Sequence, residues 1–334
     1  MTHHAHAPLS LPFDQVDPLF RDLAREHGLT CHGTPPDPTR VEIGEGEVAL
    51  APTPQGCRIT ARADTPDWLF TLQEAAVEHL AEVIPGLTLD WTSPARTGEM
   101  PPNFSLAHVV GVTRLTPHFL RLRLTGERLD RLDRDMIHFR LVLPQDDGAP
   151  RWPHLDAGGQ TVWPEGLHRP AYTVAAIDPQ ASWLDTDIFI HDGGRICNFA
   201  AQAAAGATVG LNGPGGGGIP QAAHLVLAGD ETAYPALARI AAAQAAGARI
   251  DLTLLGDSAD YPFAPRPGLT ITHRPRSEAA LARALTAAPP ADFYWIATEK
   301  ARLQVLRRAI TQDLAIPRTR AHLAAYWSAP CCEE

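Results

Sequence analysis

The sequence predicts a multidomain protein with a small N-terminal α+β domain, an antiparallel Greek-key β-barrel, and a doubly wound α/β domain with a parallel sheet. The chain has 334 residues, which is more than one ordinary core accommodates. Short apolar runs between turn residues fill its middle, whereas strands alternate with helices in its last third. We place the three domains at residues 1–95, 106–220 and 221–330.

The first domain is expected to contain two helices and several short strands. Apolar spacing predicts a helix over residues 13–28, and glycine turns separate strands between residues 40 and 63. A second, amphipathic helix begins with Thr65 as its N-cap and Pro66 at its first position. The run GLTLDWT, residues 86–92, predicts a closing strand.

The two ends of this domain lack a regular pattern. We interpret the residues before the first helix as a disordered terminus; the alternative is loose metal binding by His3, His4 and His6. Proline, serine and glycine are frequent over residues 93–105, so this stretch is interpreted as a linker.

The second domain begins with two strands in HVVGVTRLTPHFLRLRLTG, residues 108–126. Phe119, Arg121 and Arg123 alternate with leucines there, which predicts one apolar and one basic face. Further strands are expected in MIHFRLVLP, AYTVAAID, WLDTDIFIHD and GATVGLNGP, and together these short strands favour an antiparallel barrel. The long connection over residues 145–170 is expected to be a surface excursion.

In the third domain, predicted strands alternate with predicted helices. Strands are predicted in HLVLAGD, IDLTLLGD, LTITHR, DFYWIATE and RAHLAAYW. Helices are predicted between them in ETAYPALARIAAAQAAGA, which ends at Gly247, and in SEAALARALTAAP and KARLQVLRRAITQDL. This alternation indicates βαβ units and a parallel sheet that is covered on both faces.

The composition excludes several classes of function. The net charge of −10 argues against a general nucleic-acid binder, because phosphate backbones attract basic surfaces. No apolar run is long enough to span a bilayer and the start lacks a signal-peptide pattern, so we expect a cytoplasmic protein without membrane insertion. Five cysteines, an odd number, indicate free thiols.

Two glycine-containing segments are candidate phosphate sites. In LAGDETAYPALARI, residues 227–240, Gly229 permits a tight strand-to-helix turn and Thr232 is a candidate helix cap. This turn lacks GxGxxG spacing, so a nucleotide site and an ordinary connection both stay open. In VGLNGPGGGG, residues 209–218, no lysine is near and no helix is expected to follow, which favours a connection over a phosphate cradle.

Taken in order, these motifs resemble those of the siderophore-interacting proteins, a branch of the ferredoxin-reductase-like flavoenzymes. AGDETAYPALARI is similar to their pyridine-nucleotide turn, and HRPAYTVAAID to their flavin motif with an arginine before Tyr-Thr. IFIHDGGRICNFA resembles their pyrophosphate helix, DFYWIATEKARLQVLRRAI their W-x-A-x-E segment, and AYWS their terminal Tyr-Trp. The resemblance covers residues 106–328, and residues 13–92 resemble a small uncharacterised domain found fused to such proteins.

The resemblance implies FAD in the barrel domain. Tyr172 would pack on the isoalloxazine, Thr173 would hydrogen-bond near N5 with Val174 beside it, and Arg169 would pair with the pyrophosphate. The family usually has this arginine where Pro170 stands here.

A predicted helix start would face the same pyrophosphate, through these residues: His191, Asp192, Gly194, Arg195, Cys197 and Asn198. His191 fits a strand-end histidine equally well, and Cys197 is more plausible as a buried filler than as a redox thiol.

The resemblance also implies NADPH or NADH in the third domain, held by Gly229, Asp230, Glu231 and Thr232, with Arg274, Glu299 and Trp327 as further cofactor-binding candidates. Arg274 and Arg276 would receive the 2′-phosphate of NADPH, whereas Asp257 favours an unphosphorylated ribose. A helix-capping role for Glu299 is the equal alternative, and Trp327 either shields the flavin or closes the core.

The implied function is NAD(P)H-dependent reduction of a ferric siderophore by FAD, which releases iron. The chelate would dock on Arg121, Arg123 and Arg140, with a solvated barrel face as the alternative, and no catalytic residue or metal site is assigned. Two other functions stay open. One is a flavin reductase for a quinone, a haem-like chelate or a protein electron carrier, and the other is a non-enzymatic iron- or flavin-responsive binding protein.

Two further expectations concern the ends of the chain. Cys331 and Cys332 are interpreted as an exposed pair rather than as part of an iron–sulfur cluster, which needs four ligands. Every cofactor candidate lies after residue 105, so residues 1–95 are expected to be dispensable for the electron-transfer core.

Overall fold

The computed structural model describes residues 2–92, 97–134, 136–145 and 148–329. They form two compact units, each assembled from separate segments of the chain. The first unit comprises residues 1–107, 126–170 and 208–216. The second unit comprises residues 108–125, 171–207 and 217–334. Cys331 and Cys332 lie outside the described residues, so their interpretation stays a prediction.

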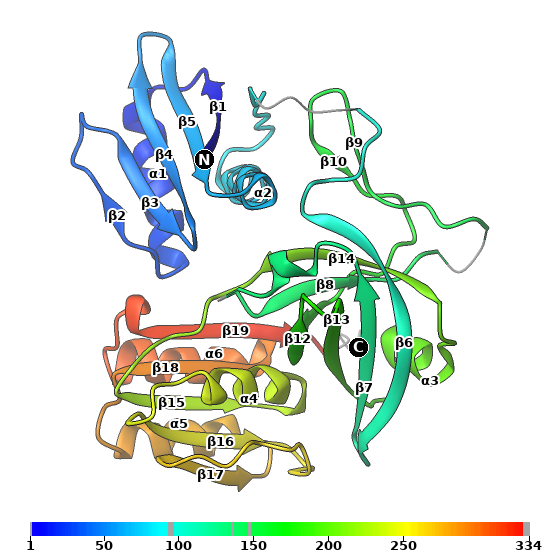
Figure 1. Cartoon of the computed structure of the whole chain (residues 1–334). Coiled ribbons are helices and arrows are strands. Elements are labelled where there is room, and N and C mark those ends of the chain that lie inside the picture. The colour runs from blue at the N-terminus through cyan, green and yellow to red at the C-terminus, as the bar shows by residue number, and fades with distance from the viewer. Residues whose placement is uncertain (1, 93–96, 135, 146–147, 330–334) are drawn as a thin grey trace, which may run out of the picture. The chain divides into compact units, whose positions relative to one another are not determined.

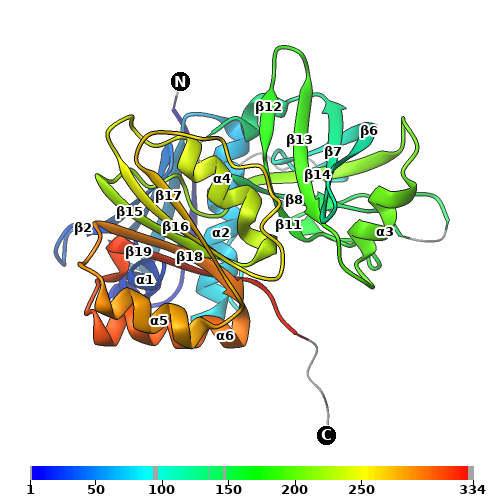
Figure 2. The same ribbon diagram turned by 90° about the horizontal axis from the view of Figure 1, so that it is seen from below.

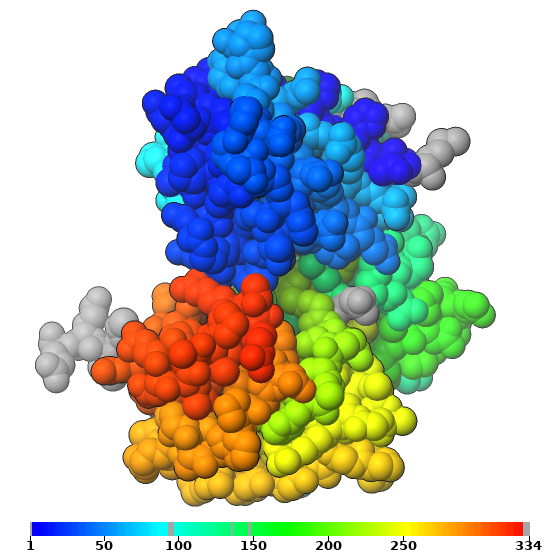
Figure 3. Space-filling model, turned by 90° about the vertical axis from the view of Figure 1, so that its left-hand side faces the viewer, coloured from blue at the N-terminus to red at the C-terminus, as the bar shows by residue number. Residues whose placement is uncertain are grey.

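The N-terminal part of the first unit is a five-stranded antiparallel sheet with two helices packed against it (Figure 1). Figure 3 shows the surface of this part in blue. The strand order is β1-β5-β4-β3-β2. The elements are β1 (His3–Leu9), α1 (Phe13–Glu26), β2 (Cys31–His32), β3 (Thr39–Ile43), β4 (Gly46–Thr53), β5 (Gly56–Ala63) and α2 (Pro66–Val83). Thr65 caps α2 as predicted, because its Oγ1 accepts a hydrogen bond from the Trp68 amide at 3.3 Å.

Two expectations for this part were wrong. The terminus is not disordered but forms β1, which pairs with β5 from His3–Ala63 to Leu9–Cys57. Its alternation of small apolar and polar residues buries Ala5, Ala7 and Leu9 on the core side, a period of two that the histidines obscured. Residues 86–92 form no strand; the Thr92 amide there donates to the His6 carbonyl at 2.9 Å.

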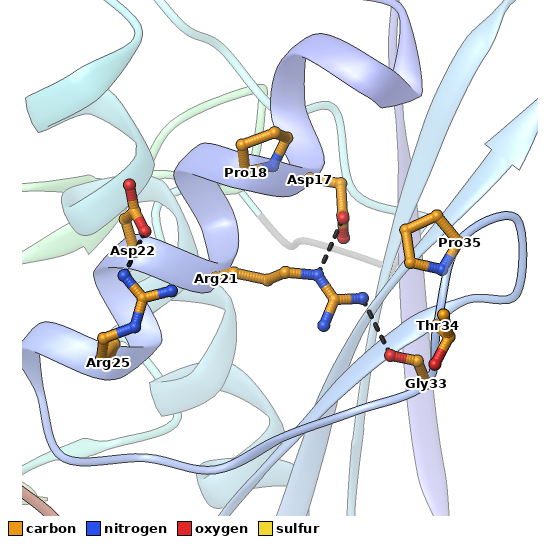
Figure 4. Close-up of a pocket in the computed structure, with 8 residues that line it drawn as sticks. All are labelled: Asp17, Pro18, Arg21, Asp22, Arg25, Gly33, Thr34 and Pro35. Carbon is orange, nitrogen blue, oxygen red and sulfur yellow. Dashed lines mark hydrogen bonds and ion pairs between the residues drawn. The ribbon is translucent and has the colours of Figure 1, made fainter.

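A pocket of the N-terminal part lies between α1 and the loop after β2 (Figure 4). Its charged side chains pair with one another: Arg21 donates to the buried Asp17 at 2.8 Å and to the Gly33 carbonyl at 3.0 Å, and Arg25 pairs with Asp22 at 2.5 Å. Thr39 also donates to Asp17. These bonds tie the helix to the loop and explain why the charges gather here.

The predicted barrel is a seven-stranded, barrel-like sheet in the order β11-β8-β14-β6-β7-β13-β12. Its strands are β6 (Phe104–Thr116), β7 (Phe119–Gly126), β8 (His138–Val142), β11 (Ala171–Thr173), β12 (Ala176–Asp178), β13 (Trp183–Phe189) and β14 (Thr208–Gly215). The first strand lies beside the last, as in a Greek key. Because β6 begins at Phe104, the linker is shorter than predicted. The excursion contains one short strand pair, β9 (His154–Leu155) with β10 (Thr161–Val162).

A buried arginine holds the end of β14 in the first unit. Arg131 lies in the short 3-10 helix η1 (Leu129–Leu132) and is only 2% exposed. Its guanidinium donates to the carbonyls of Gly213 at 3.0 Å, Leu211 at 2.9 Å and Arg128 at 2.7 Å. Burial lowers the pKa of Arg131 to about 10.

The second unit contains the predicted doubly wound domain (Figure 2). Its parallel sheet has the order β17-β16-β15-β18-β19, with strands β15 (His224–Gly229), β16 (Arg249–Leu255), β17 (Leu269–Arg274), β18 (Phe293–Glu299) and β19 (Ala321–Trp327). One face is covered by α4 (Tyr234–Ala242), the other by α5 (Glu278–Ala287) and α6 (Lys300–Arg308). Helix α3 (Arg195–Gln202), between β13 and β14, also belongs to this unit.

Helix α4 is shorter than predicted, because it ends at Ala242 rather than at Gly247. A 3-10 turn, η2 (Glu231–Ala233), precedes it.

Short helical turns complete the C-terminal part of this unit, η3 (Ala309–Asp313) after α6 and η4 (Arg318–Arg320) before β19. Among the described residues, no helix combines the length and the apolar character needed to cross a membrane.

The glycine-rich segment connects two strands. β14 ends at Gly215 and β15 begins at His224, with no helix between them. Gly216 has a φ of +77°, and a Cβ there would lie 2.6 Å from the His138 ring. The glycine is therefore required by backbone conformation and close packing, as expected for a connection.

Candidate functional site

The carboxyl edge of the parallel sheet collects the residues predicted to hold a nucleotide. Parallel strands bring their carboxyl ends to one edge, where ligands bind in sheets of this kind. Four predicted residues are each the last of a strand: Gly229, Arg274, Glu299 and Trp327. The other three, Asp230, Glu231 and Thr232, follow directly after β15.

Asp230 joins three of these strand ends. Its carboxylate is 2% exposed, and Oδ1 accepts from the Thr232 amide at 3.1 Å and the Thr232 hydroxyl at 2.5 Å. Oδ2 accepts from the Thr298 hydroxyl at 3.0 Å and from the Trp327 Nε1 at 2.9 Å. Asp230, not Thr232 as expected, is therefore the cap of the helical turn, and it links the ends of β15, β18 and β19.

Glu231 links the end of β15 to the segments that follow β16 and β17. This buried carboxylate accepts from the Asp257 amide at 3.0 Å and pairs with Arg276 at 2.5 Å. A Cβ on Gly256 would lie 2.2 Å from Glu231 Oε1, so glycine is needed beneath the carboxylate. Arg276 is thus engaged inside the protein, whereas Arg274 and the side chain of Asp257 are exposed.

Glu299 caps α6, as the second of its two interpretations predicted. Its Oε2 accepts from the Arg302 amide at 2.9 Å and its Oε1 from the Ala329 amide at 3.2 Å. These backbone donors lower the pKa of Glu299 because they stabilise the charged carboxylate. The residue fixes the chain that follows β19 to the end of β18.

Gly229 is required by packing rather than by a phosphate. A Cβ there would lie 2.7 Å from both the Ala233 Cβ and the Ala297 carbonyl oxygen. We expect Gly229→Ala to destabilise the protein by roughly 1–3 kcal/mol, because the strand and the turn cannot both keep their places. Thermal unfolding measures this.

Gly247→Ala is the matched control, since a Cβ at Gly247 meets nothing within 4 Å. An equal loss in both variants would contradict the packing argument.

The segment predicted to contact the flavin ring lies in β11 and just after it, in the second unit. Burial raises the pKa of Tyr172. The Thr173 carbonyl accepts from the Thr186 hydroxyl at 2.9 Å, and the Val174 carbonyl accepts from Arg239 Nη1 at 2.7 Å. Because Arg239 belongs to α4, the helix after the nucleotide turn is bonded directly to this segment.

The helix predicted to face the pyrophosphate is α3. Its N-cap is Gly194, no side chain caps its free amides, and Arg195 is its first residue. Backbone donors and a guanidinium at a helix start fit a diphosphate. Asp192 and Asn198 are exposed here. Cys197 is buried, and its Sγ donates to the Phe189 carbonyl at 3.2 Å.

The His191 ring lies 6.3 Å from the Phe189 ring and would be 2.6 Å from a Cβ on Gly194. Glycine is therefore needed at position 194, because the His191 ring occupies the space that a Cβ would take. A flavin role for His191 stays a prediction.

The arginines predicted for the chelate differ in their surroundings. Arg121 makes two hydrogen bonds to Asp187, at 2.7 and 2.8 Å, and Arg123 makes two to Asp185, both at 2.7 Å. These ion pairs cancel much of the basic character expected for this face of the barrel. Arg140 is exposed in the first unit and donates to the Arg169 carbonyl at 3.4 Å.

Sequence reasoning missed the carboxylates opposite these arginines. The spacing could have predicted them: Arg121 and Arg123 are two residues apart on β7, as Asp185 and Asp187 are on β13. Side chains two residues apart share one face of a strand, so the two pairs can lie opposite each other. The missed Tyr261 completes the group, since its hydroxyl donates to Asp187 at 2.6 Å. No local sequence pattern predicts that contact, because it joins residues 74 positions apart.

Comparison with known proteins identifies relatives of this arrangement. The model of the siderophore-interacting FAD-binding domain matches residues 108–218, and that of the siderophore-interacting protein matches residues 222–330. The NADPH-dependent ferric-chelate reductase of Escherichia coli (strain K12) is 32% identical over 238 residues, which are 66% of this chain and 91% of that protein. Neither family-model range includes residues 1–107.

Two solved structures are similar as well. The siderophore-interacting protein SipS from Aeromonas hydrophila is 26% identical with a TM-score of 0.58, over 69% of this chain and 94% of that one. A siderophore utilization protein from T. fusca is 28% identical with a TM-score of 0.61, over 71% of this chain and 98% of that one.

Proposed function

The chain belongs to the siderophore-interacting protein family, and we propose that it is a FAD-dependent NAD(P)H oxidoreductase that reduces ferric siderophores and thereby releases iron in the cytoplasm. The observation that carries the proposal is the carboxyl edge of the parallel sheet. There, Asp230 binds donors from Thr232, Thr298 and Trp327 and so fixes the nucleotide turn against two other strand ends.

The chemistry divides between cofactor and protein. Bound FAD would supply the conversion of a two-electron hydride donor into single-electron transfers, so that one NAD(P)H reduces two Fe(III) to two Fe(II). Hydroxamate and catecholate oxygens are hard ligands that hold Fe(III) far better than Fe(II), so the reduced metal leaves the chelate. The protein provides binding, orientation and exclusion of water, and no proton-transferring side chain is required.

Particular residues would hold the FAD. In the second unit, Tyr172 and Thr173 would contact the ring, and the uncapped start of α3 with Arg195 would receive the diphosphate. Arg169 belongs to the first unit and is exposed, so its guanidinium is available to a phosphate. The Thr186 and Arg239 bonds hold the ring-contacting segment in place, because they occupy the Thr173 and Val174 carbonyls.

For the nicotinamide nucleotide we favour NADPH. Arg274 ends β17 and is exposed, so its guanidinium is available to a 2′-phosphate. Arg276 is committed to Glu231 and would act on the site only through that carboxylate. For the ferric chelate we favour Arg140, because Arg121 and Arg123 are already neutralised by aspartates.

The first test is the cofactor itself. We expect the purified protein to be yellow, to release FAD on denaturation, and to oxidise NADPH faster when a ferric siderophore is added. A quinone and a protein electron carrier serve as comparison acceptors, and an iron-free siderophore is the control. A colourless chain that does not bind added FAD refutes the proposal, and equal rates with every acceptor refute the siderophore assignment.

A further inference from the structure

Helix α2 of the N-terminal part makes buried polar contacts outside its own sheet. Both oxygens of Glu74 are used within the first unit: Oε1 accepts from the Thr161 hydroxyl and Oε2 from the Asn103 side-chain amide, each at 2.6 Å. Asn103 also donates to Thr71 at 3.4 Å. Helix α2 lies outside the residues that the two family models match. These bonds join it to Asn103, directly before β6, and to Thr161 in β10.

Other bonds strengthen the same junction. Gln160 donates to the Leu89 carbonyl at 3.4 Å, and Arg134 pairs with Glu45. Residues 1–107 accordingly share one compact unit with residues 126–170. The N-terminal residues are therefore integrated with this part of the barrel, and their removal is expected to alter it, contrary to the expectation from the sequence.

The Thr161 contact leads to the arginine assigned to the flavin diphosphate. Thr161 lies in β10, two residues before Trp163. The Arg169 guanidinium carbon lies 4.4 Å from the centre of the Trp163 ring, a cation–π contact. Glu74 therefore holds β10, and the residue directly after β10 carries the ring that Arg169 contacts.

Electrostatics connect the same groups. Burial raises the pKa of Glu74, and the Thr161 and Asn103 hydrogen bonds oppose this by stabilising its charge. Burial and the neighbouring Arg140 lower the pKa of Arg169, while Glu78 and Glu74 act in the opposite direction. The carboxylates of α2 thus lie within electrostatic reach of Arg169.

We propose that Glu74 is a positioning residue for flavin binding: by holding Thr161 and hence Trp163, the N-terminal part fixes the Arg169 guanidinium, the phosphate-binding group that the first unit would contribute. This inference rests on the proposed function. It also accounts for the position of Arg169, which stands one residue before the family's usual arginine and needs a support of its own. The N-terminal part then contributes to cofactor affinity rather than only to assembly.

The test measures flavin affinity of the full-length chain by fluorescence titration of the cofactor-free protein. We expect Glu74→Ala to raise the Kd for FAD about tenfold and to leave the Kd for riboflavin, which has no phosphate, unchanged. Glu74→Gln, which can still accept from Thr161, is expected to stay within about threefold of wild type. Glu82→Ala, on the exposed side of the same helix, is the matched control and should not alter either Kd.

A second variant and a double mutant separate positioning from general damage. Thr161→Val breaks the contact from the barrel side, and we expect the same phosphate-specific loss. In an Arg169→Gln background, Glu74→Ala should cause no further loss, because residues that act through one another are not additive.

The outcomes distinguish a failure of the positioning role of Glu74 from a failure of the proposed function. Equal losses of FAD and riboflavin affinity, or additive losses in the double mutant, overturn the positioning role. A wild-type chain that binds no FAD overturns the proposed function itself. Normal wild-type binding with unaltered Glu74→Ala and Thr161→Val variants overturns only the present inference.

Discussion

Replacing Asp230 with alanine is expected to slow the reduction of bound flavin by NADPH on the order of a hundredfold, because the nucleotide turn loses its fixed position. The carboxylate accepts hydrogen bonds from Thr232, Thr298 and Trp327. Without it, the buried Thr298 donor and the partly buried Thr232 and Trp327 donors lose their acceptor together. Stopped-flow reduction of the flavin measures the rate, and the bound FAD content should stay normal.

Three comparison variants make this prediction specific. Asp230→Asn should restore little, since an amide nitrogen in place of Oδ2 would face the Trp327 N–H donor. Thr232→Pro removes the amide and the hydroxyl that donate to Oδ1 but leaves the Thr298 and Trp327 bonds to Oδ2, so it should have a smaller effect of the same kind. Asp292→Ala, at the opposite edge, removes a bond to the His224 amide and should not alter the rate. A normal reduction rate in Asp230→Ala would locate the nucleotide elsewhere.

Replacing Arg131 with alanine is expected to lower the free energy of unfolding by roughly 3–5 kcal/mol, one of the largest losses a single substitution in the first unit should cause. The substitution leaves a cavity and removes the donors to the Gly213, Leu211 and Arg128 carbonyls. Chemical denaturation monitored by tryptophan fluorescence measures the change.

Two controls separate the causes of that loss. Arg131→Met fills most of the space and avoids burying a charge, so it should be less destabilising than alanine while leaving the carbonyls without a donor. Arg151→Ala, at an exposed position, should change stability by no more than about 0.5 kcal/mol. If Arg131→Ala is as stable as Arg151→Ala, the buried guanidinium does not hold β14.

Much of the fold followed from local patterns. The parallel sheet was predictable because each strand is a continuous apolar run between helical segments, and α2 because Thr65 and Pro66 mark its start. β1 was missed because histidines and small residues conceal its alternation, and it is stable only when paired with β5. The expected strand at residues 86–92 has the right composition but does not form, although Thr92 at its end bonds to His6 of β1.

The candidate site was predictable in position more than in detail. Because parallel strands must share a carboxyl edge, the positions of Gly229, Arg274 and Glu299 at one edge followed from the strand order along the chain. Their individual tasks did not follow. Asp230 and Glu231 are saturated by internal bonds, and Arg121 is neutralised by Asp187, which no count of charges in the sequence reveals.

Local sequence was sufficient for most of the elements, for the position of the βα turn and for the family resemblance, because strand alternation, helix spacing and capping act between residues close in the chain. Only the tertiary structure decided which polar groups meet. The bond from Trp327 to Asp230 joins residues 97 positions apart, that from Thr161 to Glu74 joins residues 87 apart, and that from Arg131 to Gly213 joins residues 82 apart. Such contacts depend on the packing of whole layers, since burial makes an unpaired donor costly and thereby selects the fold in which each finds an acceptor.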